Sequence, residues 1–422
     1  MGKGYKFLLA LLSAAAVLFP IIPAIVRADG PVGNKLLIHN EDVVVESQPA
    51  VAYNSQTQEY LVVWQAESDG PVREVWGQRL SRGGALLGSA FRISPANGGY
   101  NPDVVYNSTS NEYLVVWETG SSILGQRLSS AGAFSGDEMR IAIGYEHGSG
   151  SHYSQPAVGY ASTANRYLVT YSYIQDIDGS TSIQARSYLN DGVLEDFIDV
   201  NEHLSTTVAE ASDLAYNRSR NEFLVVWQQR SAPDDHDIHA RRVAMSGGAA
   251  VLGNPFGIST TGSDETVPAA AAIPTNPDEG RYLVAWQSDR DVMARTLSGV
   301  GTLGALLTLA NTAWSEYQPA VAACESCQRF LAVWRWIPVS TPPAVMQVQG
   351  RTVALDGALL EETITTIGGW PQQVAYTPAV AAGPPGDFLI ATDDNATFGS
   401  STRGIYGYLW GNRVYLPVVV RN

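Results

Sequence analysis

A sevenfold internal repeat is the feature that most limits what this 422-residue chain can fold into. Each unit combines a short segment, usually containing proline, with a following apolar run, which ends in an aromatic residue in six of the seven units. The clearest copies pair 48–54 with 59–64 and 101–107 with 112–117. The last residues of the seven runs are Trp64, Trp117, Tyr171, Trp227, Trp286, Trp334 and Thr392, which are spaced by 53, 54, 56, 59, 48 and 58 residues. Such regularity indicates one closed array rather than two or three separate domains.

Within a unit, the sequence predicts four short strands, a to d, separated by turns. In the first unit we expect them at 50–53, 60–65, 75–80 and 90–94. Strand b is continuously apolar, as expected for a strand that is buried on both faces. A four-stranded unit of this length is too short for an immunoglobulin sandwich and too long for one rung of a β-helix. The sequence therefore predicts an all-β, seven-bladed β-propeller with four antiparallel strands per blade, spanning residues 29–413.

Ring closure is predicted from a strand that is left over at the N-terminus. The segment 35–39 precedes the first unit at the spacing of a strand d, while the last unit supplies only strands a, b and c, with c at 404–410. The N-terminal strand can therefore complete the seventh blade and leave no open edge. The alternative is a hairpin between strand c and the C-terminal segment 414–420. We favour the N-terminal strand.

The repeats resemble those of secreted bacterial β-propeller proteins. The resemblance rests on the pattern P-x-V-x-Y-N, then N-E-Y-L-V-V-W, then G-Q-R-L-S, best seen at 48–94 and 101–128. It covers nearly all of the chain after the leader. It implies the fold strongly and an activity weakly, since most members of that family are uncharacterised.

The N-terminus has the pattern of a secretory signal peptide, predicted at residues 1–28. Lys3 and Lys6 precede an apolar run over 7–26, and short residues flank the expected cleavage site after Ala28. A retained membrane anchor is the alternative; no later segment is apolar for long enough to span a bilayer. Because of this leader, we expect a secreted or cell-surface protein. Residues 414–422 are expected to form a C-terminal strand or tail.

The formal net charge of -15 argues against some classes of partner. Nucleic acids and anionic membrane surfaces both require a concentrated positive face. Extracellular glycans or proteins remain as expected partners.

The chain has two cysteines, Cys324 and Cys327. In an oxidising compartment we expect them to form a local disulfide, at the a–b turn of the sixth blade. A zinc site would need two further ligands, and there is no second cysteine pair.

Residues that recur at one repeat position are interpreted as structural. The tryptophans that end strand b are expected to pack between blades rather than to stack on sugars. The Gln-Arg pairs at 78–79 and 126–127 belong to strand c and are expected to make structural hydrogen bonds.

Residues that the repeat does not require are the candidates for function. In a four-stranded blade, the d–a and b–c connections emerge on one face, here called the upper face; the a–b and c–d connections lie on the lower face. The upper-face connections hold most of the histidines, many carboxylates and several aromatic residues, which suits a ligand-binding face. The candidate ligand-binding residues are Tyr145, His147, His152, Tyr153, Trp314, Glu316, Tyr317 and Trp370. Ordinary polar loops of an acidic exported protein are the alternative.

No cofactor is indicated, apart from a weak calcium candidate. Asp176 and Asp178 alternate before Gly179, as in the start of a calcium loop, but the distal glutamate of an EF-hand is missing. An Asp-Gly turn explains the same residues.

The function expected first is a non-enzymatic binding or cell-surface interaction module for a glycan or protein ligand. One alternative is a secreted hydrolase that uses loop carboxylates on glycans. Another is a structural component of the cell envelope. The sequence contains no sialidase-type Asp box, and no nucleophile elbow, P-loop or dinucleotide fingerprint in a matching context. No catalytic residue is therefore assigned.

Overall fold

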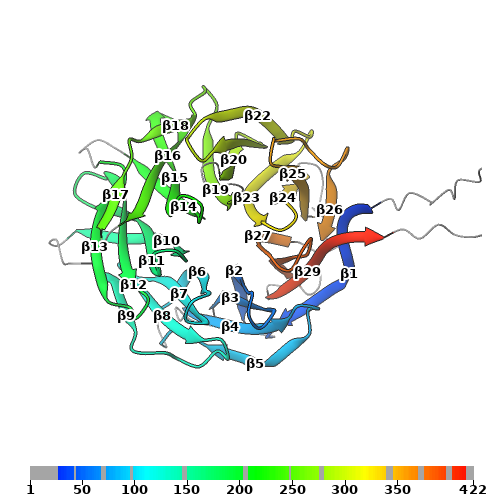
Figure 1. The fold of residues 1–422 in the computed structure, drawn as a ribbon, viewed down its shortest axis with the longest axis horizontal. Helices are drawn as coiled ribbons and strands as arrows, with labels where there is room; N and C mark the ends of the chain where they lie inside the picture. Colours follow the sequence, from blue (N-terminus) through cyan, green and yellow to red (C-terminus); the bar gives the residue numbers. More distant parts are fainter. Residues whose placement is uncertain are drawn as a thin grey trace, which may run out of the picture.

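The computed structural model describes residues 27–41, 44–67, 73–95, 98–144, 150–202, 208–246, 249–274, 280–338, 346–368, 375–395 and 402–414. All regular elements in these ranges are β-strands. They form seven blades around a central channel (Figure 1). The predicted all-β, seven-bladed propeller is confirmed.

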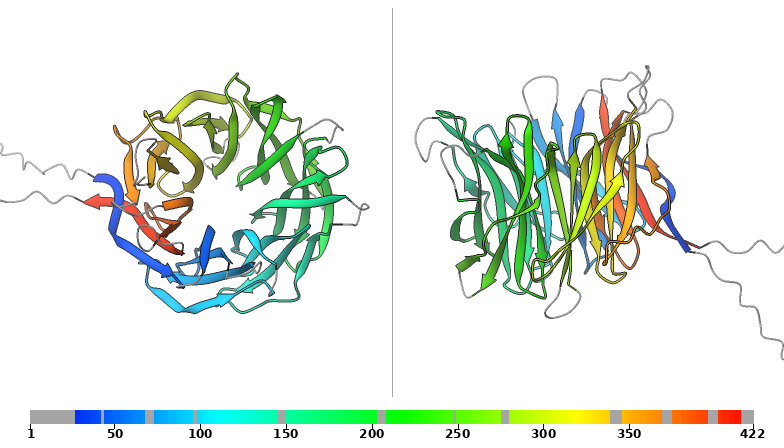
Figure 2. Two further views of the ribbon diagram at one scale, coloured as in Figure 1. Left: turned by 180° about the vertical axis from the view of Figure 1, so that it is seen from behind. Right: turned by 90° about the horizontal axis from the view of Figure 1, so that it is seen from above.

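Each blade is an antiparallel sheet whose first strand lies nearest the channel and whose last strand lies at the rim (Figures 1 and 2). Blade 1 contains β2 (Val45–Asn54), β3 (Glu59–Glu67), β4 (Arg73–Ser81) and β5 (Leu86–Arg92). Blade 2 contains β6 (Tyr100–Asn107), β7 (Glu112–Thr119), β8 (Ser122–Ser129) and β9 (Met139–Ala142). Blade 3 contains β10 (Ser151–Ala161), β11 (Arg166–Gln175), β12 (Thr181–Leu189) and β13 (Leu194–Asp199).

The remaining blades follow the same order. Blade 4 contains β14 (Ala209–Asn217), β15 (Glu222–Ala232) and β16 (Asp235–Ser246), with an outer edge divided between β17 (Ala249–Leu252) and β18 (Phe256–Ser259). Blade 5 contains β19 (Glu265–Ile273), β20 (Arg281–Ser288), β21 (Asp291–Ser298) and β22 (Leu303–Ala310). Blade 6 contains β23 (Ser315–Cys324), β24 (Arg329–Ile337), β25 (Gln347–Ala354) and β26 (Thr365–Gly368). Blade 7 contains β27 (Ala375–Ala382), β28 (Phe388–Asn395), β29 (Arg403–Val414) and β1 (Arg27–His39).

The N-terminal strand closes the ring, as predicted. β1 pairs antiparallel with β29 and forms the outer strand of blade 7, with Leu36 opposite Gly407 and His39 opposite Ile405. The two strands lie side by side in Figure 1. The pairing is longer than predicted, because β29 continues to Val414 and offers β1 a partner along its whole length. A single parallel pair, Val45 with Arg403, joins blade 7 to blade 1.

The strands at the ring closure and in blade 1 have bounds that differ from those expected. β1 begins at Arg27, and its first two residues pair with Val414 and Arg413. Residues 1–26 and the tail 415–422 lie outside the described residues. The innermost strand of blade 1 begins at Val45 rather than at residue 50, because pairing resumes beyond a bulge at Gln48, whose φ is 54°. Its outer strand, β5, ends at Arg92, and Ile93 and Ser94 follow it.

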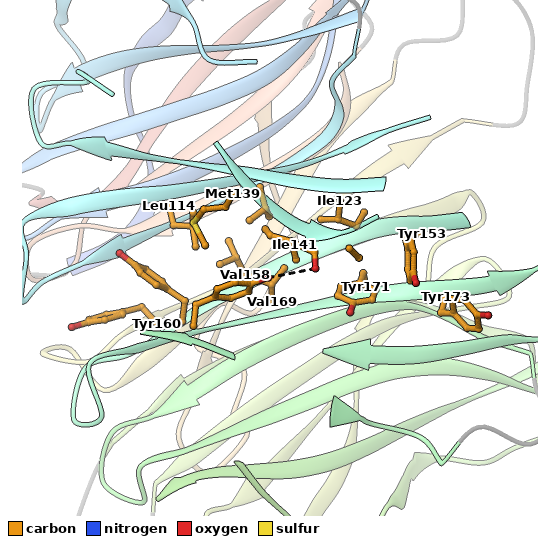
Figure 3. Packing of buried hydrophobic residues seen from close by; sticks show 14 residues of the cluster. Leu114, Ile123, Met139, Ile141, Tyr153, Val158, Tyr160, Val169, Tyr171 and Tyr173 are labelled. Atoms are coloured by element: carbon orange, nitrogen blue, oxygen red, sulfur yellow. Dashed lines mark hydrogen bonds between the residues drawn. The ribbon is translucent and has the colours of Figure 1, made fainter. Parts of the chain in front are cut away.

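Seven apolar clusters hold the blades together, and each cluster spans two successive blades. Figure 3 shows the cluster between blades 2 and 3, where Ile141 of β9 meets Val169 and Tyr171 of β11. The last cluster joins blade 7 to blade 1 and includes Ile38 of β1. Since strand b contacts a neighbouring blade on each side, its residues 60–64 are fully buried.

The residues interpreted as structural have that role. Trp64, Trp117, Trp227, Trp286 and Trp334 are at most 1% exposed and belong to five different inter-blade clusters. Arg79 forms an ion pair with Glu59 at 2.6 Å and donates a hydrogen bond to the backbone oxygen of Ala131 in blade 2. These contacts fit a packing and tethering role for the repeat motif.

Candidate functional site

The upper end of the central channel opens into a hollow lined by side chains from blades 1, 2, 6 and 7. The channel itself has a volume of about 640 Å³ and is lined by the innermost strands of all seven blades. The hollow at its mouth has a volume of about 420 Å³. Its lining includes Arg73, Arg335 and Arg403, together with Tyr100 and Tyr376.

Local structure places all five side chains at the upper ends of strands. Arg73 and Arg403 are the first residues of strand c in blades 1 and 7, and Arg335 lies near the end of strand b in blade 6. Tyr100 and Tyr376 lie at the start of innermost strands. Because neighbouring strands are antiparallel, these ends all lie on the upper face.

The arginines are held by stacking on the two tyrosines. The guanidinium carbon of Arg73 lies 5.3 Å from the ring centre of Tyr100. Those of Arg335 and Arg403 lie 5.0 Å and 4.7 Å from the ring centre of Tyr376. Stacking of this kind orients a guanidinium group while leaving its edge donors available.

The three arginines differ in how far their charge is compensated. Arg403 is bonded to the buried carboxylate of Asp393 at 2.8 Å, and Arg73 to Glu67 at 3.2 Å. Arg335 donates to the sulfur of Met346, and its Nε atom is buried without a hydrogen-bond partner. Among the described residues, no carboxylate forms an ion pair with Arg335. Burial, together with the nearby Arg403, lowers its pKa.

Asp393 carries a carboxylate that acts on both Arg403 and Arg335, and it forms an ion pair with Arg403. Burial raises its pKa to about 6, against the opposing effects of the Arg403 guanidinium and the backbone N–H of Thr377. The Asp393 carboxylate accepts that N–H bond at 2.9 Å. The Asp393 carboxylate therefore holds the backbone of β27 as well as the side chain of Arg403.

Arg335 occupies a position that other blades use for an inter-blade hydrogen bond. The residue after the tryptophan of strand b is Gln65, Glu118 and Gln228 in blades 1, 2 and 4. These side chains accept the backbone N–H of Asn101, Gln155 and Val267, each in the following blade, at 3.3, 3.1 and 2.9 Å. A guanidinium has no acceptor atom and cannot make this bond. Arg335 is thus released from the structural role of its position.

Such a cluster suits an anionic group. Planar guanidinium groups donate paired hydrogen bonds to carboxylate, sulfate or phosphate oxygens. Amide side chains from Gln48, Gln65, Asn101 and Gln318 also line the hollow. A cluster of three arginines is notable in a chain whose net charge is -15.

Two of the residues predicted from sequence belong to the same blade as Arg335 but are not among the residues that line the hollow. Tyr317 pairs with Arg335 across β23 and β24. Trp314 is partly exposed on the same blade and packs edge-on against Trp336, with ring centres 6.1 Å apart. The indole N–H of Trp336 donates to the Thr312 hydroxyl at 3.3 Å.

Two other predicted residues are buried and do not face solvent. Glu316 is fully buried and bonded to the Thr312 hydroxyl, and burial raises its pKa. Tyr153 is 1% exposed and packs against Tyr171 and Tyr173 (Figure 3). Both occupy the same repeat position, three residues before the proline, where the innermost strand has already begun. The sequence pattern treated this position as part of a loop.

The acidic pair predicted as a weak calcium site has other partners. Asp176 bonds to the Nδ1 atom of His152 at 2.8 Å. Asp178 accepts the backbone N–H of Ser180 at 2.9 Å and its hydroxyl at 2.7 Å, as expected for an Asp-Gly turn. Within the described ranges, no group of three or more His, Cys, Asp or Glu side chains is arranged to hold a metal. Tyr145, His147 and Trp370 lie outside the described residues.

The two cysteines form a disulfide in the turn between β23 and β24, with Cα atoms 5.4 Å apart. This is the a–b turn of blade 6 that the sequence predicted. It places the disulfide on the lower face, away from the arginines. Among the described residues, no helix is both long and apolar enough to cross a membrane.

Sequence reasoning missed the three arginines, although a signal was present. Aligning the position after each strand-b tryptophan shows Gln65, Glu118, Ser172, Gln228, Gln287, Arg335 and Asp393. Arg335 is the single cation in this set. The convergence of Arg73, Arg335 and Arg403 depends on the closure of the ring, which no local pattern reports.

Comparison with known proteins supports the fold and does not identify a family. No protein-family profile matches the sequence, and no curated protein matches it. A crystal structure of a protein of unknown function from Dyadobacter fermentans is similar, with a TM-score of 0.54 and 10% identity, over 93% of this chain and 100% of that chain. At such low identity the similarity concerns the fold alone.

Two further solved structures are more distant. The β-propeller domain of the Trilobed protease from Pyrococcus furiosus has a TM-score of 0.48 and 6% identity, over 87% of this chain and 95% of that chain. An α-L-arabinofuranosidase from Fusarium graminearum has a TM-score of 0.49 and 12% identity, over 76% of this chain and 98% of that chain. Neither likeness carries an argument about function.

Proposed function

We propose that this protein is a non-enzymatic binding module that recognises an anionic group at the upper mouth of its central channel. The ligand is an acidic glycan, or a protein that presents a similar acidic group. Arg73, Arg335 and Arg403 contact the anion, while the amides around the hollow donate further hydrogen bonds.

The observation that carries this proposal is the state of Arg335. It is a partly buried cation without a carboxylate bonded to it among the described residues, at a position where other blades have a hydrogen-bond acceptor. Leaving a charged donor buried and incompletely bonded costs free energy. A bound anion would recover that cost, and this supports a binding role over a purely structural one.

The tryptophan pair on blade 6 favours a glycan over other acidic ligands. Trp314 and Trp336 lie on the blade that carries Arg335, and both are partly exposed. Aromatic rings of this kind cover the apolar face of a sugar. Export to the cell surface or medium belongs to the same proposal, and it rests on the leader pattern and on the resemblance to secreted bacterial propeller repeats.

The test is binding of matched acidic and neutral oligosaccharides. An array of acidic and neutral glycans selects a ligand, and calorimetric titration then compares that ligand with its neutral counterpart. We expect Arg335→Gln to weaken binding of the acidic ligand by about tenfold or more, since it removes at least one charge-assisted hydrogen bond. Glutamine is the residue at this position in blades 1, 4 and 5, so the variant should fold.

Arg82→Gln is the matched control, because Arg82 is an arginine on the lower face that pairs with Asp387 at 2.7 Å. It should leave the affinity unchanged. Equal binding of the acidic and neutral ligands, or equal loss in both variants, would refute the proposed site. Turnover of the ligand in a hydrolysis assay would instead support the hydrolase alternative.

A further inference from the structure

A second, smaller cavity lies at the seam where the ring closes. It has a volume of about 80 Å³ and is lined by the last residue of β1, by two residues that follow it, and by β2, β3 and β4 of blade 1. The lining residues are His39, Glu41, Val44, Glu46, Ala66, Glu74 and Trp76. Three carboxylates, one histidine and one indole therefore surround a space that suits only a small group.

The charge of Glu74 is already compensated. Its carboxylate accepts hydrogen bonds from Arg92 and from the indole N–H of Trp76, both at 3.0 Å. Glu74 therefore helps to orient Trp76 and is not the carboxylate that a ligand would need.

Glu46 has an oxygen left over. The side chain is 1% exposed, and its Oε1 atom bonds to His39 and to the indole N–H of Trp64, the latter at 3.2 Å. Its Oε2 atom is buried without a hydrogen-bond partner. An unpartnered carboxylate oxygen in a buried site is costly, and a donor with a positive charge would remove that cost.

The glutamates at the equivalent position of blades 5 and 6 share the unpartnered oxygen and differ in their other bonds. The Oε2 atoms of Glu265 and Glu316 are also buried without a hydrogen-bond partner. Their Oε1 atoms are bonded to serine and threonine hydroxyls. At Glu46 the partner is instead His39, which the closing strand supplies and which lines the cavity together with Glu41. The unpartnered oxygen therefore belongs to the repeat position, whereas the closing strand supplies part of the cavity wall.

The outer part of the cavity provides a second carboxylate. Glu41 is 53% exposed, and its carboxylate oxygen lies 3.9 Å from the Nε2 atom of His39. A positively charged group entering past Glu41 would meet the unpartnered oxygen of Glu46, with apolar contact from Val44 and Ala66. Trp76 adds an aromatic wall, and such a wall attracts cations.

From this geometry we infer that the cavity is a binding site for a primary alkylammonium group, such as a small free amine or the end of a lysine side chain. The ammonium donates to Glu46 and Glu41, and the alkyl part lies against Val44, Ala66 and Trp76. This site is separate from the arginine cluster and does not rest on the proposed function.

The test uses n-butylammonium chloride and, as a neutral counterpart of the same shape, n-butanol, at constant ionic strength. The readout is the indole N–H resonances of Trp64 and Trp76, observed by NMR. We expect a saturable shift with n-butylammonium and no saturable shift with n-butanol. N-acetyl-lysine N-methylamide distinguishes the two sources, since it saturates the same shift only when a lysine side chain fits the site.

Glu41→Gln should weaken n-butylammonium binding by about fivefold or more, and Glu46→Gln should abolish it. Glu325→Gln, at an exposed glutamate on the lower face, is the control and should leave binding unchanged. Because Glu41 is exposed, its variant tests the inference even if Glu46→Gln does not fold. Equal responses to the amine and the alcohol, or wild-type affinity in Glu41→Gln, would overturn it. Arg335→Gln should not affect this site, so failure here is distinguishable from failure of the anion site.

Discussion

One position of the innermost strand is alanine in five blades and aspartate in two. The aspartates are Asp103 and Asp213, which line the channel. Each carboxylate accepts the backbone N–H of its own next residue and one from the following blade. For Asp103 the second donor is Val158, at 2.7 Å; for Asp213 it is Ala270, at 2.8 Å. Aspartate in place of alanine at this one position therefore adds a hydrogen bond between two successive blades.

The same residues predict a pH dependence of stability. Burial, reinforced by the charge of Asp213, raises the pKa of Asp103 to about 7, and burial raises that of Asp213 to about 6. Both values lie above that of an unfolded aspartate, so the folded state binds more protons between about pH 4 and 7. The contribution to stability is therefore present at low pH and is lost as the pH rises through 6 to 7.

We expect Asp103→Ala to lower the melting temperature by less at pH 8 than at pH 5, each time relative to the wild type. The variant loses two hydrogen bonds at either pH, but it also loses the cost of ionising a buried carboxyl, which applies only at the higher pH. Thermal unfolding of both proteins at the two pH values measures this difference. The same difference in melting temperature at pH 5 and pH 8 would contradict the assignment.

Trp314 is the aromatic residue that we expect to matter most for a glycan ligand. Trp314→Ala removes one ring of the edge-on pair with Trp336. It should weaken binding of the acidic ligand by more than about 1 kcal/mol, which is roughly fivefold in Kd. Titration calorimetry measures the change. Gln56→Ala and Arg82→Ala, on the lower face, should change the affinity little. A ligand whose affinity falls in these two variants and not in Trp314→Ala would place the site on the lower face.

At the scale of elements, β1 does more than any other strand to decide the architecture. It covers the outer edge of β29 and brings Ile38, which is 2% exposed, into the cluster shared by blades 7 and 1. Lys35 forms an ion pair with the buried Asp394 and lies 3.7 Å from the ring centre of Tyr406. His39, whose pKa is raised by its hydrogen bond to Glu46, links the strand to blade 1.

Removing residues 29–40 should therefore open the ring. The deletion leaves β29 as an unpaired edge and exposes the last inter-blade cluster, so we expect a large drop in melting temperature. The milder variant Ile38→Ala should cost about 2–5 kcal/mol, the usual range for such a truncation in a packed core. Denaturant unfolding measures both. A deletion variant with the wild-type melting temperature would show that the N-terminal strand does not lock the ring.

At the scale of the whole molecule, the arginine cluster combines residues from the two ends of the array. Arg73 belongs to the first blade, whereas Arg335 and Arg403 belong to the last two. They meet only because the seventh inter-blade cluster joins blade 7 to blade 1. The proposed anion site is consequently a property of the closed ring, and we expect it to be absent from a fragment of a few blades.

Ligand binding and folding should therefore be coupled. In urea, loss of binding to the acidic ligand should coincide with loss of tryptophan fluorescence, and a ligand at 100 times its Kd should stabilise the protein by about 2.7 kcal/mol. In Arg335→Gln, the same ligand concentration should stabilise much less. Binding that persists after the fluorescence transition would show that the site does not need the closed ring.

The sequence by itself determined the features that repeat. The number of blades, the order of strands, the inter-blade tryptophans and the position of the disulfide all follow from local periodicity, because each blade makes the same contacts with its neighbours. The closing strand was also predictable, since the count of strands in the last unit was one short. These features need no knowledge of distances between remote residues.

Tertiary structure alone decided which upper-face residues are available to a ligand. Glu316 and Tyr153 read as loop residues, yet the innermost strand continues past its bulge and carries them into the interior. Arg73, Arg335 and Arg403 read as isolated charges on three different strands, yet the curvature of the ring gathers them around one hollow. The local sequence pattern indicates which face of a strand a side chain occupies. The distance between blades 1 and 6, however, is fixed only when the last inter-blade cluster forms.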